Sequence, residues 1–210
     1  MSELNNEQLN NDTEATAYEA PKPSQDKKTS FWKGVIEQIE LVVIAFAIII
    51  LIFSFAVRTC EVSGASMENT LYNKETVLIS NLFYSPKRGD IIVFHQTGDK
   101  YNEPIVKRVI GLPGDTVKIE YVNQSMILTV TTKDGVSEVL SEDYIKYEGP
   151  NYYTNSETYV DEGHLFVLGD NRSISADSRS SNIGLVDERR VLGKVIFRVA
   201  PLSRFGAINK

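Results

Sequence analysis

Hydrophobic residues form one uninterrupted stretch near the amino terminus and only short runs after it. Residues 41–57 (LVVIAFAIIILIFSFAV) contain no charged side chain, whereas residues 1–33 contain two Leu and no Ile. At about 1.5 Å per residue, the run spans about 25 Å as a helix. Extension back through Val35, Ile36 and Ile39 reaches the ~30 Å thickness of a bilayer's hydrocarbon core. The pattern predicts a membrane-spanning helix over residues 34–57.

The flanks of this run predict its orientation. Residues 1–33 are rich in Asn, Glu, Thr, Ser and Lys, and we expect a disordered tail because they offer little apolar surface to bury. Four of these residues are lysines, and only Arg58 follows the run closely, so the positive-inside rule places the tail in the cytoplasm. A cleaved secretory signal has a shorter apolar stretch, typically about 7–15 residues. We therefore expect a retained single-pass anchor in the cell membrane, with residues 58–210 outside.

The hydrophobic runs beyond residue 58 are short and separated by turn signals. They are rich in β-branched and aromatic residues, which is typical of β strands. The runs cover residues 76–80, 90–94, 105–110, 116–121, 126–131, 165–168 and 191–199. Residues 141–163 are rich in Tyr, Asn and Glu with weak periodicity, which indicates an insertion or flap. We expect a mainly β domain over residues 58–210, with a smaller subdomain inserted at about residues 116–163.

Composition narrows the chemistry that this domain can perform. Residues 58–210 carry 18 basic and 20 acidic side chains, with no basic stripe of the kind that binds a nucleic-acid backbone. We therefore expect no nucleic-acid partner. Cys60 is the single cysteine of the chain, and there are two histidines, which argues against a disulfide or a metal centre. We expect no cofactor, and chemistry carried by Ser, Lys, Asp, Arg and Tyr.

The first candidate for chemistry is the stretch of residues 63–71 (SGASMENTL), which begins six residues after the apolar run ends. A nucleophilic serine needs its hydroxyl on a turn, with backbone N–H groups nearby to hold a developing oxyanion. Gly64, two residues before Ser66, permits a close backbone approach. By itself, the stretch fits an ordinary turn equally well.

A nucleophilic serine also needs a base. His95 and His164 each adjoin a predicted strand, but neither lies among other side chains of catalytic type. A buried lysine is the alternative, because desolvation disfavours the ammonium form and lowers its pKa. Lys107 lies in the run 105–110, where strand alternation places it and Arg108 on opposite faces. The pattern leaves open which of the two points into the domain.

A third stretch, residues 169–179 (GDNRSISADSR), follows a strongly apolar run and is dense in hydrogen-bonding groups. In such a loop Ser175 could fix the orientation of an amine, while Asp177 and Arg179 could pair to brace the loop. A solvated turn is the other interpretation.

Taken together, these stretches resemble the type I signal peptidases (bacterial signal peptidase I), membrane-bound serine peptidases that remove signal peptides from exported proteins. The resemblance extends over residues from about 33 to 202. It rests on five stretches that occur in the family's order, namely residues 66–71 (Ser-Met-x-x-Thr-Leu), 88–94 (RGDIIVF), 107–115 (KRVIGLPGD), 169–179 and 193–195 (GKV). Five matches in order are far more specific than any one of them.

The resemblance assigns roles to the candidate residues. It implies that Ser66 is the nucleophile and Lys107 the general base of a Ser–Lys dyad. It also implies that Ser175 orients the lysine, and that Asp177 and Arg179 form a structural ion pair.

The oxyanion region is only partly assigned by the resemblance. The Ser66 backbone N–H would be one donor. Gly64 occupies the position where some members of the family carry a serine hydroxyl as the second donor. The second donor stays open, with Ser63 as a candidate.

The resemblance further implies preproteins bearing signal peptides as substrates, cleaved after small residues of the Ala-x-Ala type, and the lipid bilayer as a partner. Two departures from the family's pattern stand out. Asn69 replaces the usual Pro, and four residues separate Arg179 from Gly184 where shorter family members have two. Neither departure removes a reactive group, so an active enzyme is expected.

Other interpretations compete with this one. A non-enzymatic, membrane-anchored β domain for binding or for envelope or pilus assembly would leave Ser66 and Lys107 merely structural. Residues 30–33 (SFWK) match the Ser-x-x-Lys signature of other acyl-enzymes, but they fall on the cytoplasmic side of the predicted anchor. A self-cleaving Ser–Lys repressor would carry a DNA-binding domain where this chain has a tail and an anchor. The sequence gives no indication of an oligomeric state.

Overall fold

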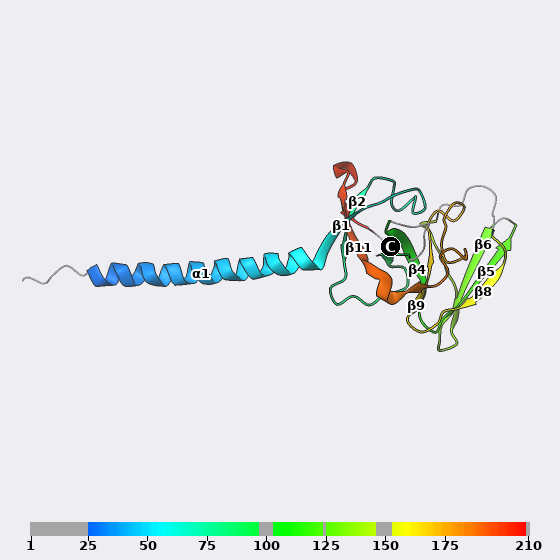
Figure 1. The fold of residues 1–210 in the computed structure, drawn as a ribbon, viewed down its shortest axis with the longest axis horizontal. Coiled ribbons are helices and arrows are strands. Elements are labelled where there is room, and N and C mark those ends of the chain that lie inside the picture. The colour runs from blue at the N-terminus through cyan, green and yellow to red at the C-terminus, as the bar shows by residue number, and fades with distance from the viewer. Residues whose placement is uncertain (1–24, 97–102, 124, 146–152, 209–210) are drawn as a thin grey trace, which may run out of the picture. The chain divides into compact units, whose positions relative to one another are not determined.

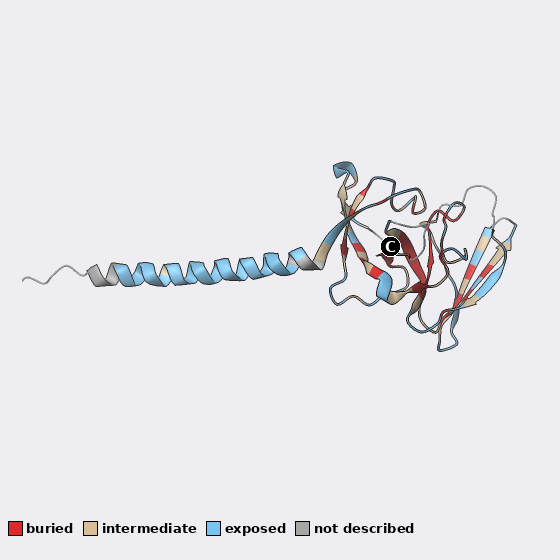
Figure 2. Ribbon diagram, in the orientation of Figure 1, coloured by how far each residue is buried: buried red, intermediate tan, exposed pale blue. Residues whose placement is uncertain are grey.

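The computed structural model describes residues 25–96, 103–123, 125–145 and 153–208, and it divides the chain into two compact units, residues 1–48 and 49–210. The first unit holds most of helix α1 (Gln25–Ala56). The segment Thr29–Ile52 of this helix is long and apolar enough to cross a membrane. Its side chains are almost all exposed to solvent, which Figure 2 shows in pale blue.

Helix α1 begins at Gln25, earlier than the predicted start at residue 34. Pro21 and Pro23 both precede this start, and the residues that follow include Gln25 and three lysines, which favour helix. The helix therefore extends into the tail that the sequence predicts to be disordered, and residues 1–24 of that tail lie outside the described residues. The helix ends at Ala56, and the first strand begins at the next residue.

The larger unit is built on an eight-stranded antiparallel sheet, with the order β1-β2-β11-β3-β4-β9-β10 and with β12 paired to β11 (Figure 1). Its strands are β1 (Val57–Glu61), β2 (Thr76–Ser80), β3 (Ile91–Phe94), β4 (Ile105–Gly111), β9 (His164–Leu168), β10 (Val186–Asp187), β11 (Val191–Ala200) and β12 (Gly206–Ala207). Two short 3₁₀ helices, Glu188–Arg190 and Leu202–Arg204, flank β11.

A second, four-stranded sheet of order β7-β6-β5-β8 falls within residues 116–163, where the sequence predicts the insert. Its strands are β5 (Thr116–Val122), β6 (Ser125–Thr131), β7 (Ser137–Val139) and β8 (Ser156–Tyr159). Apolar side chains of β5 and β6 form one buried cluster with Ile110, Phe166 and Leu168 of the first sheet. The prediction of a mainly β fold is confirmed.

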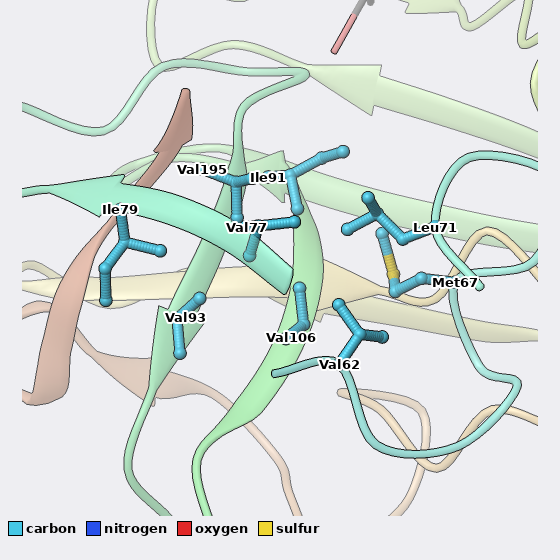
Figure 3. Close-up of a cluster of buried hydrophobic side chains, with 9 residues drawn as sticks. All are labelled: Val62, Met67, Leu71, Val77, Ile79, Ile91, Val93, Val106 and Val195. Carbon is cyan, nitrogen blue, oxygen red and sulfur yellow. The ribbon is translucent and has the colours of Figure 1, made fainter. Parts of the chain in front are cut away.

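Strand β3 lies in the middle of the first sheet and is covered on both faces. Ile91 and Val93 belong to one buried cluster, while the alternating residues Ile92 and Phe94 belong to another. Figure 3 shows the first of these clusters, with Met67 placed beside Leu71. Because β4 pairs directly with β3, side chains on either face of β4 enter the interior.

The sequence pattern did not predict β1, β7, β8, β10 or β12. Strands β10 and β12 contain two residues each, and β7 and β8 are mostly exposed and polar. Strand β1 adjoins the apolar run, but it leaves the helix to pair with β2 along its whole length. These strands form through pairing with neighbours, and they carry little hydrophobic signal of their own.

Candidate active site

Ser66 lies on a tight turn between β1 and β2. The amides of Thr70 and Leu71 both donate to the Met67 carbonyl, at 3.0 and 2.8 Å. Met67 and Leu71 are buried in the cluster of Figure 3, so the residue that follows Ser66 anchors the turn in the core. Ser66 itself is half-buried.

Gly64 was predicted to permit a close backbone approach, but the structure shows that the turn needs its positive φ instead. A β-carbon at position 64 would meet no atom within 4 Å, so no close backbone approach occurs there. The φ of Gly64 is +87°, in the region that glycine enters without steric cost. Its N–H donates to Asn73 Oδ1 at 2.9 Å. The requirement at this position is therefore conformational.

Lys107 lies directly opposite the Ser66 hydroxyl. The distance from Lys107 Nζ to Ser66 Oγ is 2.7 Å, and Nζ also donates to the Val106 carbonyl at 2.9 Å. Lys107 is only 3% exposed. Burial lowers the pKa of Lys107 to about 8, although the Asp177 and Asp170 carboxylates oppose this shift. A lysine with a pKa of 8 is neutral in about a tenth of molecules at pH 7, against well under ~1% for an ordinary lysine.

Arg108, on the opposite face of β4, is also buried. Its Nε and Nη2 atoms donate to Asp170 at 2.8 and 2.7 Å, and Nη1 donates to the Gly89 carbonyl at 2.8 Å. Strand alternation left open which of Lys107 and Arg108 points inward. Both do, because β4 has packing on each face and Asp170 balances the guanidinium charge.

Ser175 is buried and packs against Gly169. A β-carbon at position 169 would lie 2.2 Å from Ser175 Oγ and 2.5 Å from the Ser66 carbonyl oxygen. Among the described residues, Ser175 Oγ has no hydrogen-bond partner, so no bond to Lys107 is formed in this structure. Its orienting role stays a prediction. Gly169 provides the close approach that the sequence assigned to Gly64.

Asp177 and Arg179 form a buried, bidentate pair. Arg179 Nε donates to Asp177 Oδ1 at 2.9 Å, and Nη2 donates to Oδ2 at 2.8 Å. The two side chains are 0% and 2% exposed. Asp177 Oδ2 also accepts a hydrogen bond from the Gly169 N–H at 3.1 Å. The ion pair is therefore connected to the start of the polar loop, residues 169–179.

Asn171 is a site residue that the sequence reasoning did not single out. Its backbone N–H donates to the Ser66 carbonyl at 3.0 Å, and its Nδ2 donates to the Ala65 carbonyl at 3.2 Å. Asn171 thereby fixes the backbone of the serine turn from the opposite loop. The only sequence feature that pointed to Asn171 was its place in the polar stretch 169–179. Its hydrogen-bond partners, Ala65 and Ser66, lie about a hundred residues earlier, so no local pattern could predict the contact.

A cavity of about 440 Å³ opens in front of Ser66 and Lys107. Its lining is mostly apolar or small, and comprises Val62, Ser63, Ser66, Met67, Glu103, Pro104, Ile105, Val106, Lys107 and Ala176. Ser63, the candidate second oxyanion donor, is part of this lining. The site therefore combines a paired hydroxyl and amine with a groove that could receive a chain segment.

The two histidines, which are the alternative candidates for the general base, lie outside the cavity at Ser66. Neither His95 nor His164 lines this cavity. His164 Nδ1 lies 3.1 Å from the Glu162 carbonyl oxygen, and His95 is exposed at the end of β3. In the part of the chain that the structure describes, no group of three or more His, Cys, Asp or Glu side chains could hold a metal ion.

Known proteins and a family model match this chain in sequence. The family model "Signal peptidase, peptidase S26" matches residues 35–200. Signal peptidase IB of Staphylococcus aureus (strain COL) is 33% identical over 188 residues, covering 82% of this chain and 93% of the relative. Signal peptidase I of Bacillus licheniformis is 33% identical over 186 residues, covering 86% and 96%.

Among solved structures, a signal peptidase I from Enterococcus faecalis V583 is 35% identical. It covers 53% of this chain and 97% of its own, with a TM-score of 0.39. The family model extends over most of the chain, including the serine turn, strand β4 and the polar loop that the site brings together. The chain belongs to the signal peptidase family, peptidase S26.

Proposed function

We propose that this protein is a membrane-bound serine endopeptidase that removes amino-terminal signal peptides from preproteins, with Ser66 as the nucleophile and Lys107 as the general base. The family membership supports the activity. The observation that carries the assignment of residues is the 2.7 Å distance between Lys107 Nζ and Ser66 Oγ, for a lysine whose pKa is lowered by burial.

The first half-reaction forms an acyl-enzyme. The neutral Lys107 amine accepts the Ser66 hydroxyl proton as Oγ attacks the carbonyl carbon before the scissile bond. The resulting oxyanion needs preorganised donors. Among the described residues, the Ser66 N–H donates to no backbone carbonyl, which leaves it available for this role. Ser63, which lines the same cavity, is the candidate second donor.

The first half-reaction ends when the tetrahedral intermediate collapses. The Lys107 ammonium gives its proton to the leaving amine, which releases the mature protein and leaves the signal peptide as an ester on Ser66. The second half-reaction then restores the enzyme. The neutral amine then takes a proton from water, whose oxygen attacks the ester. Proton return from Lys107 to Ser66 Oγ releases the signal peptide as a carboxylic acid, which loses its proton to the solvent, and no cofactor is needed.

The lining of the cavity indicates which substrate residues are accepted before the scissile bond. Val62, Ile105 and Ala176 give it apolar walls, which suit small aliphatic side chains of an extended peptide. We therefore assign it the Ala-x-Ala type of site that the sequence resemblance implies. Ser175, Asp177 and Arg179 are proposed to hold the dyad and its loop in place.

The membrane topology completes the proposal. Helix α1 contains a span, Thr29–Ile52, that is apolar enough for a single crossing; Lys22, Lys27 and Lys28 precede it, and Lys33 lies near its start. The amino terminus is then cytoplasmic and residues 58–210 lie outside. Membrane anchoring raises the effective concentration of preprotein cleavage sites near Ser66, with the lipid bilayer and the preprotein as partners.

The test is cleavage of a membrane-inserted preprotein by the purified full-length chain. Ser66→Ala and Lys107→Ala should each lower the rate by about 10³-fold or more, with an unchanged circular dichroism spectrum. A penem-type acylating probe should label the wild-type protein and not Ser66→Ala. Wild-type cleavage by Lys107→Ala would refute the dyad, and an inert, unlabelled wild-type protein would favour a non-enzymatic anchored domain.

A further inference from the structure

Between strands β7 and β8 of the inserted sheet, the chain contacts Arg108 of β4 and Arg172 of the polar loop. We define residues 142–145 as the strap. Within it, the Tyr144 hydroxyl donates to Glu142 Oε1 at 2.6 Å, and Glu142 forms a buried ion pair with Arg172. Burial, followed by the Glu142 carboxylate, raises the pKa of Tyr144, so its hydroxyl stays protonated as a donor. The strap is thus fixed to the loop that carries Ser175.

The strap also contacts the strand that carries Lys107. The Tyr144 ring lies over the Arg108 guanidinium, with 3.8 Å between Arg108 Cζ and the ring centroid. Arg108 directly follows Lys107 in β4 and is already held by Asp170 and the Gly89 carbonyl. A cation over an aromatic face is attractive, and more so when both groups are removed from water. The strap therefore packs on the buried polar side of the catalytic strand.

Asn69 joins this strap to the serine turn. Its Nδ2 donates to the backbone carbonyls of Tyr144 and Ile145, at 3.4 and 3.1 Å. Its φ is +69°, a conformation that asparagine tolerates far better than most residues. The proline usual at this position in the family has φ fixed near −65° and could not adopt it. The turn of this chain thus follows a path that depends on a residue able to enter the left-handed region.

Other residues attach the turn to the rest of the domain. Met67 and Leu71 enter the hydrophobic core, and Asn171 donates to the carbonyls of Ala65 and Ser66. The Thr70 hydroxyl donates to Asp170 Oδ2, and its carbonyl accepts from Arg198 Nη2 at 2.6 Å. Asn69 is exposed and supplies the attachment toward the inserted sheet. Among the described residues, the hydrogen bonds from the turn to the strap come from this single side-chain amide.

We propose that Asn69 is a positioning residue, which holds the Ser66 turn against the strap and so keeps the hydroxyl aligned with Lys107. This inference rests on the proposed function, because it takes Ser66 as the nucleophile. Asn69 touches neither reacting atom, so its removal should slow attack by Ser66 without altering the proton affinity of Lys107 or substrate binding in the cavity.

The test compares two substitutions at this position with a matched control. Asn69→Gly retains access to positive φ and removes the amide, whereas Asn69→Asp retains the shape and removes the donor. Asn123→Gly is the control, because Asn123 is also exposed with a positive φ, of 50°, but lies in the turn between β5 and β6. Active sites of each full-length protein are titrated with the penem-type probe, so that kcat refers to competent enzyme alone.

Both Asn69 variants should lose about three- to tenfold in kcat per titrated site, as expected for the loss of hydrogen bonds that hold a reacting group. Their KM and the midpoint of the pH–rate profile should match the wild type, and Asn123→Gly should match it in all respects. A wild-type kcat per titrated site in either Asn69 variant would overturn the inference, including the case where only the number of titratable sites falls. Retained cleavage by Ser66→Ala would instead overturn the proposed function itself.

Discussion

The α-carbon of Gly169 packs against the side chain of Ser175 so closely that any β-carbon at position 169 would lie 2.2 Å from Ser175 Oγ. The same β-carbon would lie 2.5 Å from the Ser66 carbonyl oxygen, which is backbone and cannot rotate away. Gly169 therefore controls how near the polar loop can approach the serine turn.

Gly169→Ala should strongly impair catalysis by pushing the loop and the Ser66 turn apart. Displacement of a reacting group by about 1 Å can lower a rate by about 10²-fold, and we expect a fall of at least that order in kcat/KM for preprotein cleavage. Gly34→Ala is the matched control, because a β-carbon there would meet nothing within 4 Å. Near-normal activity of Gly169→Ala would show that the loop adjusts without cost.

Burial of Lys107 should make the stability of the protein depend on pH. Its pKa falls from 10.5 to about 8 on folding, so between these values the unfolded chain binds more protons than the folded one. Stability then rises with pH across this window, and below it the buried ammonium costs about 3 kcal/mol. Lys107→Met removes this titration while keeping an unbranched side chain.

We expect Lys107→Met to be more stable than the wild type at pH 7, with an advantage that shrinks by about 3 kcal/mol on going to pH 10.5. Urea unfolding of the full-length protein in detergent, followed by far-ultraviolet circular dichroism at the two pH values, measures this difference. A difference in unfolding free energy that does not change with pH would show that the lysine is not shifted.

The Asp177–Arg179 pair should contribute strongly to stability because it is buried. Asp177→Asn leaves the Arg179 guanidinium without its countercharge, at a side-chain exposure of 2%, and should cost about 3–5 kcal/mol. The chain offers a matched control in Asp187 and Arg189, which have the same spacing but an arginine that is 89% exposed. Asp187→Asn should cost far less, as is usual for surface pairs. Equal losses in unfolding free energy would contradict a structural role for the buried pair.

Much of the fold followed from local patterns in the sequence. Strand β2 and the core of β4 were predicted because β-branched residues run between clear turn signals, as in residues 76–80. Strands β7 and β8 escaped prediction because their stability comes from pairing with β6 and β5. The burial of Arg108 could not be predicted either, since it requires Asp170 from a distant loop.

The candidate site likewise has residues that sequence motifs indicated and residues whose contacts only the structure shows. The family resemblance, carried by five motifs in order, implied Ser66 and Lys107 as a dyad, whereas the residues by themselves left alternatives open for each. The functions of Gly169, Asn171 and Asn69 depend on contacts across the fold, with Ser175, Ala65 and the strap respectively, which no local pattern encodes. Gly64 was assigned the close approach that Gly169 makes, because sequence alone does not separate a glycine needed for space from one needed for its φ.

The most direct test of the mechanism is the pH dependence of kcat/KM for preprotein cleavage by the full-length protein between about pH 6 and pH 10. If the neutral amine of Lys107 activates Ser66, log kcat/KM should rise by one per pH unit and level off near the Lys107 pKa of about 8. A rate that is constant from about pH 6 to pH 8, or that keeps rising to the ordinary lysine pKa of about 10.4, would contradict a buried, readily deprotonated Lys107 as the base.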